Sequence, residues 1–118
     1  MDVLSSKIKE KVARFGFENY QNLKVSADSY LHIFLFKEYN CILTAVKSPA
    51  ESVEGDYLIS VFSKMENRNI KIPEKYGYVY DNKDRIHVKN EDEFEKLCRD
   101  FENYLKCERY KVNKIKTL

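Results

Sequence analysis

Glycine, proline and tryptophan are scarce in this sequence. Its 118 residues include 3 Gly, 2 Pro and no Trp, which excludes collagen-like, linker-like and low-complexity classes. The three glycines stand alone, at positions 16, 55 and 77. A phosphate-binding loop or a dinucleotide-binding turn needs several glycines at short, fixed spacings. Neither can be built here, so nucleotide-binding classes that depend on such loops are excluded.

Cysteine, targeting segments and long apolar runs are also lacking. The cysteines are Cys41, Cys98 and Cys107, an odd number with no C-x-x-C pair. This predicts free thiols in a reducing compartment rather than a disulfide framework. No apolar run reaches the roughly 18 residues of a membrane helix, and the first residues lack the basic and apolar regions of a signal peptide. We therefore expect a cytoplasmic protein with no membrane partner.

Neither sign of charge is in clear excess. Lys and Arg number 21, Asp and Glu number 19, and the formal net charge is +2. That balance alone favours neither nucleic acid nor a membrane as a partner. The last residues depart from it, because 110–118 form a lysine-bearing basic tail. Apolar residues make up 43% of the chain, which favours a compact core over disorder.

Hydrophobic periodicity predicts a helix at each end of the chain and strands between them. Leu4, Ile8, Val12 and Phe15 recur at helical spacing and predict an amphipathic helix over about 3–15. The period then changes to two. Apolar runs predict strands at about 23–27, 30–38, 41–47, 57–63, 77–81 and 85–89. Short polar turns join most of them, which requires antiparallel pairing.

The middle of the chain carries three further expectations. The run 30–39 is apolar on both of its faces, which favours a central strand covered on both sides. Residues 63–75 are mostly polar and predict a long surface loop, with a short extended piece at 70–72. The runs 77–81 and 85–89 flank a four-residue polar turn and predict a hairpin.

The last predicted element is a long helix over about 91–109. Asn90 can cap its start, and Glu93 three residues later completes the pattern of a capping box. One apolar stripe runs along it, formed by Phe94, Leu97, Cys98, Phe101, Tyr104 and Leu105. Cys107 falls off that stripe and is expected to be exposed. The whole chain therefore predicts a single α+β domain, 1–118: an antiparallel sheet of five to six strands with an N-terminal helix and a long C-terminal helix.

No familiar catalytic or metal constellation is present. The His and Cys residues occur singly, whereas a structural zinc site needs them in closely spaced pairs. If residues 36 and 41 pair across the 30–47 hairpin, His32 and Cys41 lie about 13 Å apart, too far for a thiol–imidazole pair. Glu54 and Asp56 are the one carboxylate pair that could hold a cation before a strand. We expect no metal, no cofactor and no enzymatic activity, with an enzyme of unfamiliar site as an alternative.

Nucleic-acid binding is another alternative, because basic residues gather in the second half of the chain. Phosphate contacts from such residues dominate nucleic-acid affinity, and aromatic side chains on a sheet can stack on bases. The basic candidates are Lys64, Arg68, Lys71, Lys106, Arg109, Lys111, Lys114 and Lys116. No RNP-like pattern accompanies them.

The favoured hypothesis is a small cytosolic protein-binding module, such as an inhibitor, adaptor or chaperone-like protein. A phage or other mobile element is a candidate origin for such a module. Tyrosine is enriched at protein interfaces because it offers a large area and a hydroxyl at low entropic cost. The candidate contacts are Tyr39, Tyr76, Tyr78, Tyr80 and Tyr110. The strand at 57–62 is a further candidate as a sheet edge, open to strand addition or to pairing with a second copy in a homodimer.

Overall fold

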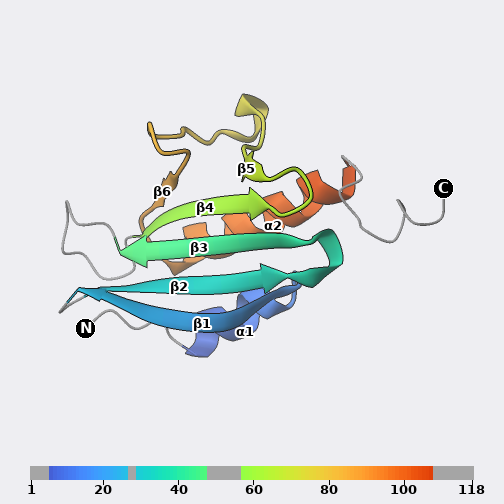
Figure 1. Ribbon diagram of the computed structural model, residues 1–118. Coiled ribbons are helices and arrows are strands. Elements are labelled where there is room, and N and C mark those ends of the chain that lie inside the picture. The colour runs from blue at the N-terminus through green and yellow to red at the C-terminus, as the bar shows by residue number, and fades with distance from the viewer. Residues whose placement is uncertain (1–5, 27–28, 48–56, 108–118) are drawn as a thin grey trace.

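The structure, a computed structural model, describes residues 6–26, 29–47 and 57–107. Two helices and six strands follow one another in the α+β arrangement that the sequence predicts (Figure 1). The helices are α1 (Ser6–Ala13) and α2 (Glu91–Cys107). The strands are β1 (Phe17–Ser26), β2 (Ser29–Phe36), β3 (Cys41–Lys47), β4 (Tyr57–Ser63), β5 (Arg68–Ile70) and β6 (Ile86–Val88). Two short 3-10 turns are η1 (Lys37–Tyr39) and η2 (Glu74–Tyr76).

The strands form one antiparallel sheet in the order β1-β2-β3-β4-β5, and β6 also pairs with β4. The register of the β2–β3 hairpin is the predicted one, since Phe36 lies opposite Cys41 and His32 opposite Ala45. β4 is paired on both sides, because β3 takes one edge and β5 and β6 share the other. The prediction that 57–62 forms a sheet edge is therefore wrong. Among the described residues, the long edge of the sheet is β1 instead.

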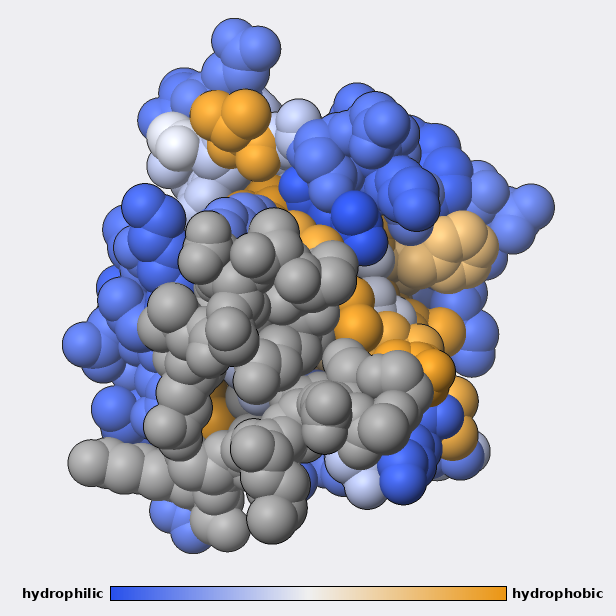
Figure 2. Space-filling model, turned by 90° about the vertical axis from the view of Figure 1, so that its left-hand side faces the viewer, coloured by the Kyte–Doolittle hydropathy of each residue, from blue (hydrophilic) through white to orange (hydrophobic). Residues whose placement is uncertain are grey.

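The helices cover only one face of this sheet. In Figure 1 both α1 and α2 lie behind the strands, and no helix of the described residues lies on the near face. The alternation along β2 follows this arrangement: His32 and Phe34 are buried under the helices, whereas Leu31 and Ile33 on the other face are partly exposed. The expectation of a strand covered on both sides is not met by the described residues. Figure 2, turned so that this near face lies at its right, shows hydrophobic side chains along that side.

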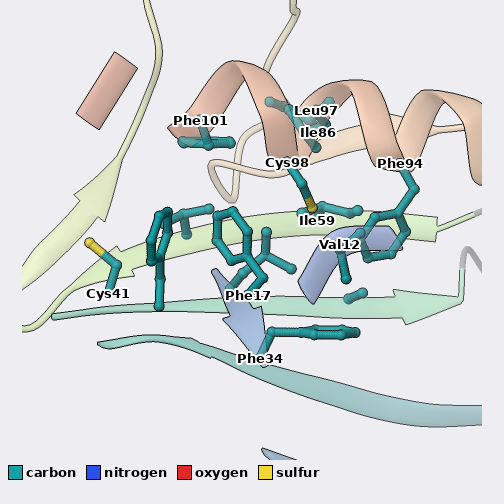
Figure 3. Close-up of a cluster of buried hydrophobic side chains, with 14 of the residues drawn as sticks. Val12, Phe17, Phe34, Cys41, Ile59, Ile86, Phe94, Leu97, Cys98 and Phe101 are labelled. Atoms are coloured by element: carbon teal, nitrogen blue, oxygen red, sulfur yellow. The ribbon is translucent and has the colours of Figure 1, made fainter. Parts of the chain in front are cut away.

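The core lies between the covered face and the two helices. Phe94, Cys98 and Phe101 project from α2 toward the strands, where they meet residues such as Phe34 and Ile59 (Figure 3). The rings of Phe34 and Phe94 pack edge to face, with centroids 5.9 Å apart. Every residue of the predicted α2 stripe is buried except Tyr104, which packs partly buried at its border. The 3.6-residue period in the sequence therefore identified the buried face of this helix.

Local interactions explain where the helices begin and end. The side-chain Oδ1 of Asn90 accepts the backbone N–H of Glu93 at 2.9 Å, and Oε1 of Glu93 accepts the N–H of Lys89 at 2.8 Å. This is the predicted capping box with one difference. Glu93 accepts the N–H of Lys89, the residue before the cap, instead of the N–H of Asn90 itself. α1 ends at Ala13, two residues before the predicted end, and the predicted start at residues 3–5 lies outside the described residues. Gly16 follows with φ +93, and a Cβ there would lie 2.7 Å from the Phe36 ring, so only glycine fits this turn.

Three strand predictions need correction. β1 begins at Phe17, six residues before the predicted start, because its polar residues obscure the alternation. β5 lies at 68–70, inside the segment interpreted as a loop, after a turn in which Asn67 has φ 55. The predicted strand at 77–81 is absent from the described residues, where only the isolated bridge between Tyr80 and Ile86 remains of the expected hairpin. Tertiary contacts of the tyrosines, described below, hold that segment in an irregular path.

Truncating Phe101 tests the packing of α2. The ring is 1% exposed at the centre of the stripe, so Phe101→Ala should lower the free energy of unfolding by about 3–5 kcal/mol. Urea unfolding followed by circular dichroism measures this change. Val79→Ala is the control, because Val79 is 84% exposed and its truncation should change stability by less than about 0.5 kcal/mol. Equal midpoints for the two variants would contradict the packing described here.

Candidate functional site

β1 presents an exposed edge with apolar side chains. Tyr20, Leu23 and Val25 are 64%, 40% and 55% exposed, and they account for most of the large, strongly exposed hydrophobic residues among those described. All three lie on one strand whose outer side pairs with no other described strand. An unpaired strand edge offers backbone N–H and C=O groups to an added strand. Here those groups are accompanied by side chains that water solvates poorly.

Two irregularities in the β1–β2 ladder explain why Tyr20 and Val25 are exposed. The register shifts between Asn19 and Gln21 and again between Lys24 and Ser26. Tyr20 and Val25 are the residues left without a partner on β2. A β-bulge redirects the side chain of its extra residue and increases the local twist. The edge between the bulges, 21–24, keeps a regular register with β2.

A small polar network holds the first bulge in place. The Asn19 side chain donates from Nδ2 to the Ile33 carbonyl at 3.2 Å, replacing a ladder bond that the bulge disrupts. Asn19 and Asn22 also exchange side-chain hydrogen bonds, at 3.2 and 3.3 Å. Oδ1 of Asn22 accepts Nδ1–H of the buried His32 at 2.8 Å. The network therefore ties the edge strand to a side chain within the covered face.

The uncovered face of the sheet is a second candidate surface, which we call the open face. Its side chains come from positions that lie directly opposite one another on neighbouring strands. They are Glu18, Gln21, Leu23, Leu31, Ile33, Leu35, Ile42, Thr44, Val46, Leu58, Ser60, Phe62, Asn69 and His87. Only Glu18 among them carries a formal charge at pH 7, and it lies at the border, 3.5 Å from the Lys37 ammonium group. The centre of the open face is therefore uncharged.

The tyrosines that the sequence singled out are mostly engaged within the molecule. Tyr39 is fully buried, with its ring 4.6 Å from that of Phe36, so it offers no surface to a partner. Tyr76 packs edge to face on Tyr104 at 6.2 Å. Tyr110 lies outside the described residues. Tyr78 and Tyr80 do not lie on the predicted strand at 77–81, because that segment forms no strand, and Tyr76 ends η2.

Hydrogen bonds account for the inward position of Tyr78 and Tyr80. The Tyr78 hydroxyl donates to Asp100 Oδ2 at 2.6 Å, and Lys96 Nζ contacts the same carboxylate oxygen at 2.9 Å. Burial raises the pKa of Tyr78, and the bond to Asp100 raises it further. The Tyr80 hydroxyl accepts the N–H of Ile72 at 2.8 Å, and burial raises the pKa of Tyr80 to about 12. Both hydroxyls thus serve the fold, as buried tyrosine hydroxyls commonly do.

Three of the basic candidates for nucleic-acid contact are paired with acids. Arg68 Nε donates to Glu66 Oε1 at 2.8 Å, and Lys71 lies 3.3 Å from the Asp84 carboxylate. Lys106 lies 3.4 Å from Glu102, one helical turn earlier. Lys64 is exposed at the end of β4. Arg109, Lys111, Lys114 and Lys116 fall outside the described residues.

The groups with catalytic or metal-binding potential are dispersed. No group of three or more His, Cys, Asp or Glu residues that could hold a metal occurs within the described ranges. Cys41 is buried, its Sγ–H donates to the Tyr39 carbonyl at 3.4 Å, and burial raises its pKa to about 12. Glu54 and Asp56 lie outside the described residues. Neither α1 nor α2 has the length and apolar character that a membrane-crossing helix requires.

A groove of about 750 Å³ lies between the 77–81 segment, β6 and the start of α2. Two carboxylates line it, and both have structural partners. Asp81 accepts the Lys83 and Arg85 N–H groups and the Arg85 side chain, each at 2.9 Å. Glu93 belongs to the capping box of α2. Both carboxylates that line the groove are therefore already engaged in hydrogen bonds that support the fold.

Comparison with known proteins does not help to choose between these surfaces. No family model, no curated protein and no solved structure matches this chain. Sequence reasoning missed Tyr20 and found Leu23 and Val25 only as members of a strand. The alternation of Leu23 and Val25 was the available signal, but a bulge that redirects a side chain leaves no mark in a hydrophobic pattern.

Removing the Asn19 amide tests the bulge network. Asn19→Ala deletes the bond to the Ile33 carbonyl and the exchange with Asn22, and it should lower the free energy of unfolding by about 1 kcal/mol. Gln21→Ala, an exposed neighbour on the same strand, should cost less than about 0.5 kcal/mol. Urea titration of both variants measures the difference. If the two lose the same stability, the network does not support the bulge.

The three thiols should react at different rates. Cys107 is exposed at the end of α2, whereas Cys41 and Cys98 are buried and burial raises the pKa of both. Only the thiolate reacts with a maleimide, so one thiol should be modified rapidly in the folded protein at pH 7.5. The other two should react only after denaturation. Mass spectrometry of tryptic peptides identifies the site, and first modification at Cys98 would contradict the orientation of α2.

Proposed function

We propose that this protein is a non-enzymatic protein-binding module that takes an extended segment of its partner onto the edge strand β1. One observation carries the proposal: Tyr20, Leu23 and Val25 are exposed together on a strand whose outer side has no paired neighbour among the described residues. Strand addition uses backbone hydrogen bonds for affinity and alternate side chains for specificity. β1 offers both kinds of contact.

The two bulges favour a specific partner over indiscriminate aggregation. A long, flat, apolar edge pairs readily with any other exposed strand, and natural edges are commonly interrupted by bulges for that reason. On β1 the interruptions leave a short regular stretch, 21–24, between two displayed side chains. A partner segment of similar length would gain backbone bonds along that stretch. It would also contact Tyr20 at one end and Val25 at the other.

The partner that fits this edge is an extended, largely apolar segment. The exposed side chains at the edge are an aromatic ring and two aliphatic groups, so apolar residues at alternate positions of the partner would bury them. Such burial is favourable by roughly 25 cal/mol per Å² of apolar surface. Nucleic-acid binding has weaker support, because Arg68, Lys71 and Lys106 are already paired with acidic side chains.

A matched pair of valine substitutions tests the proposed site. Extended peptides selected from a displayed random library on the full chain serve as the probe. Val25→Lys should weaken their binding at least about tenfold, because it places a charge in the apolar contact. Val79→Lys adds the same charge at a valine that is 84% exposed and lies in the 77–81 segment, so affinity should not change. Fluorescence polarisation measures both affinities.

Hydrogen exchange separates strand addition from simple side-chain docking. With peptide bound, the amides of 20–25 that point away from β2 should exchange more slowly, because they become hydrogen-bonded. Amides of α2 should not change. Selected peptides that bind Val25→Lys as tightly as the wild type would overturn the assignment to β1. A failure of the selection to yield any binding peptide would count against the proposal as a whole.

A further inference from the structure

The open face has the anatomy of an interface rather than of a solvated sheet. Its centre, on β2, β3 and β4, is formed by Leu31, Ile33, Leu35, Ile42, Val46, Leu58 and Phe62, each partly exposed. Most of its border is polar, with Glu18 and Gln21 on β1, Asn69 on β5 and His87 on β6, and Leu23 on β1 is the apolar exception. Antiparallel sheets that face water usually alternate apolar and polar residues. An apolar centre with a polar rim is instead the usual plan of a protein contact surface.

The two polar residues at the centre of the face oppose burial less than two isolated hydroxyls would. Thr44 and Ser60 lie opposite each other on β3 and β4, and their hydroxyl oxygens are 2.8 Å apart. Burying a hydroxyl is costly when its hydrogen bond is lost. Here one hydroxyl donates to the other, so the pair satisfies one of its two O–H donors internally. An apolar partner that desolvates the centre therefore leaves one hydroxyl donor without a bond, rather than two.

No helix of the described chain is available to cover this face. α1 and α2 already bury their apolar stripes on the opposite side of the sheet, through Ile8 and Val12 in α1 and the stripe around Phe101 in α2 (Figure 1). A second copy of the chain, by contrast, always brings an uncharged apolar surface of the same extent. Two such faces meet without repulsion between like charges. Sheets pack face to face at about 10 Å when both faces are apolar.

The extent of the face suits a weak, reversible dimer. Three strands spaced about 4.8 Å apart and seven residues long at about 3.3 Å each span roughly 330 Å² in projection. Allowing for side-chain relief, two copies would bury on the order of 1,000 Å² in total, which is the lower limit for a specific interface. Interfaces of this size commonly exchange at micromolar concentrations.

We infer that the open face is a self-association surface on which a second copy of this chain packs face to face through β2, β3 and β4. The inference goes beyond the proposed binding function and uses different residues. Packing of this kind leaves β1 of each copy at the side of the assembly. The dimer would then display two β1 edges, and a partner with two extended segments could bind both with increased avidity.

A central charge on the open face tests this inference. Sedimentation equilibrium of the full chain between about 1 and 300 µM should show the average mass rising toward twice that of one chain. Thr44→Lys puts a cation at the centre of both copies, where a partly exposed position lets it reach water in the monomer. It should weaken dimerisation at least about 100-fold. Circular dichroism and thermal unfolding check that the variant is folded.

Two controls distinguish this surface from the β1 edge. Val79→Lys adds the same charge in the 77–81 segment and should dimerise like the wild type. Val25→Lys should also dimerise normally while losing peptide binding, which separates the dimer from the proposed function. A dimer lost in Val25→Lys but kept in Thr44→Lys would instead assign self-association to β1 and overturn the inference. A wild-type chain that stays monomeric throughout would also overturn it.

A labelling experiment covers the case in which Thr44→Lys fails to fold. Thr44→Cys in a Cys107→Ser background places a thiol at the centre of the open face. The rate of its reaction with maleimide should fall in proportion to the fraction of chains that sedimentation finds in the dimer, because packing covers the thiol. Val25→Cys in the same background should react at one rate at every concentration. A Thr44→Cys rate that does not depend on protein concentration would contradict face-to-face packing.

Discussion

The burial of the α2 stripe against one face of the sheet is the contact on which the rest of the structure depends. α2 is long enough to lie across the sheet, and α1 completes the same layer beside it. An antiparallel sheet needs only one covered face to form a core. Because both helices occupy the same side, the apolar residues on the other side of β2, β3 and β4 remain partly exposed. The candidate surfaces follow from this one-sided arrangement.

The same arrangement explains the properties of the β1 edge. Phe17 anchors the start of β1 in the core, with its ring 4.3 Å from Phe36, and Gly16 permits the close turn from α1. Beyond that anchor the strand leaves the helices, and its side chains become exposed from Tyr20 onward. The bulge at Tyr20 is held by Asn19, Asn22 and buried His32. Polar contacts thus maintain an edge that displays apolar groups.

Much of the fold could be predicted from periodicity and capping. The α2 stripe, the capping box at Asn90, the β2–β3 register and the α+β class are all confirmed. These features depend on residues close in sequence or on a hydrophobic period that one element carries by itself. The candidate site was predicted less well. Tyr39 was a candidate contact for a protein partner and is buried, because its ring folds back onto Phe36.

The errors share a physical cause. The tyrosines at 76, 78 and 80 occupy alternate positions, as in a strand. The Tyr78 hydroxyl, however, donates to Asp100, and the Tyr80 hydroxyl accepts the N–H of Ile72, so these bonds stabilise a different path of the backbone. The order of strands in the sheet placed 57–63 inside it and left β1 at the edge. Such pairings join residues far apart along the chain, and a hydrophobic pattern contains no information about which strands become neighbours.

By itself, the sequence determined which residues of α2 face the core, since burial along a helix follows a period set by local backbone geometry. Its scarcity of glycine also excluded phosphate-cradling loops. Only the tertiary structure decided that both helices share one side of the sheet, that β1 is its long edge, and that Tyr20 and Val25 are displayed there. The reason is that the exposure of a side chain depends on which other element packs against it, and that element is distant in the sequence.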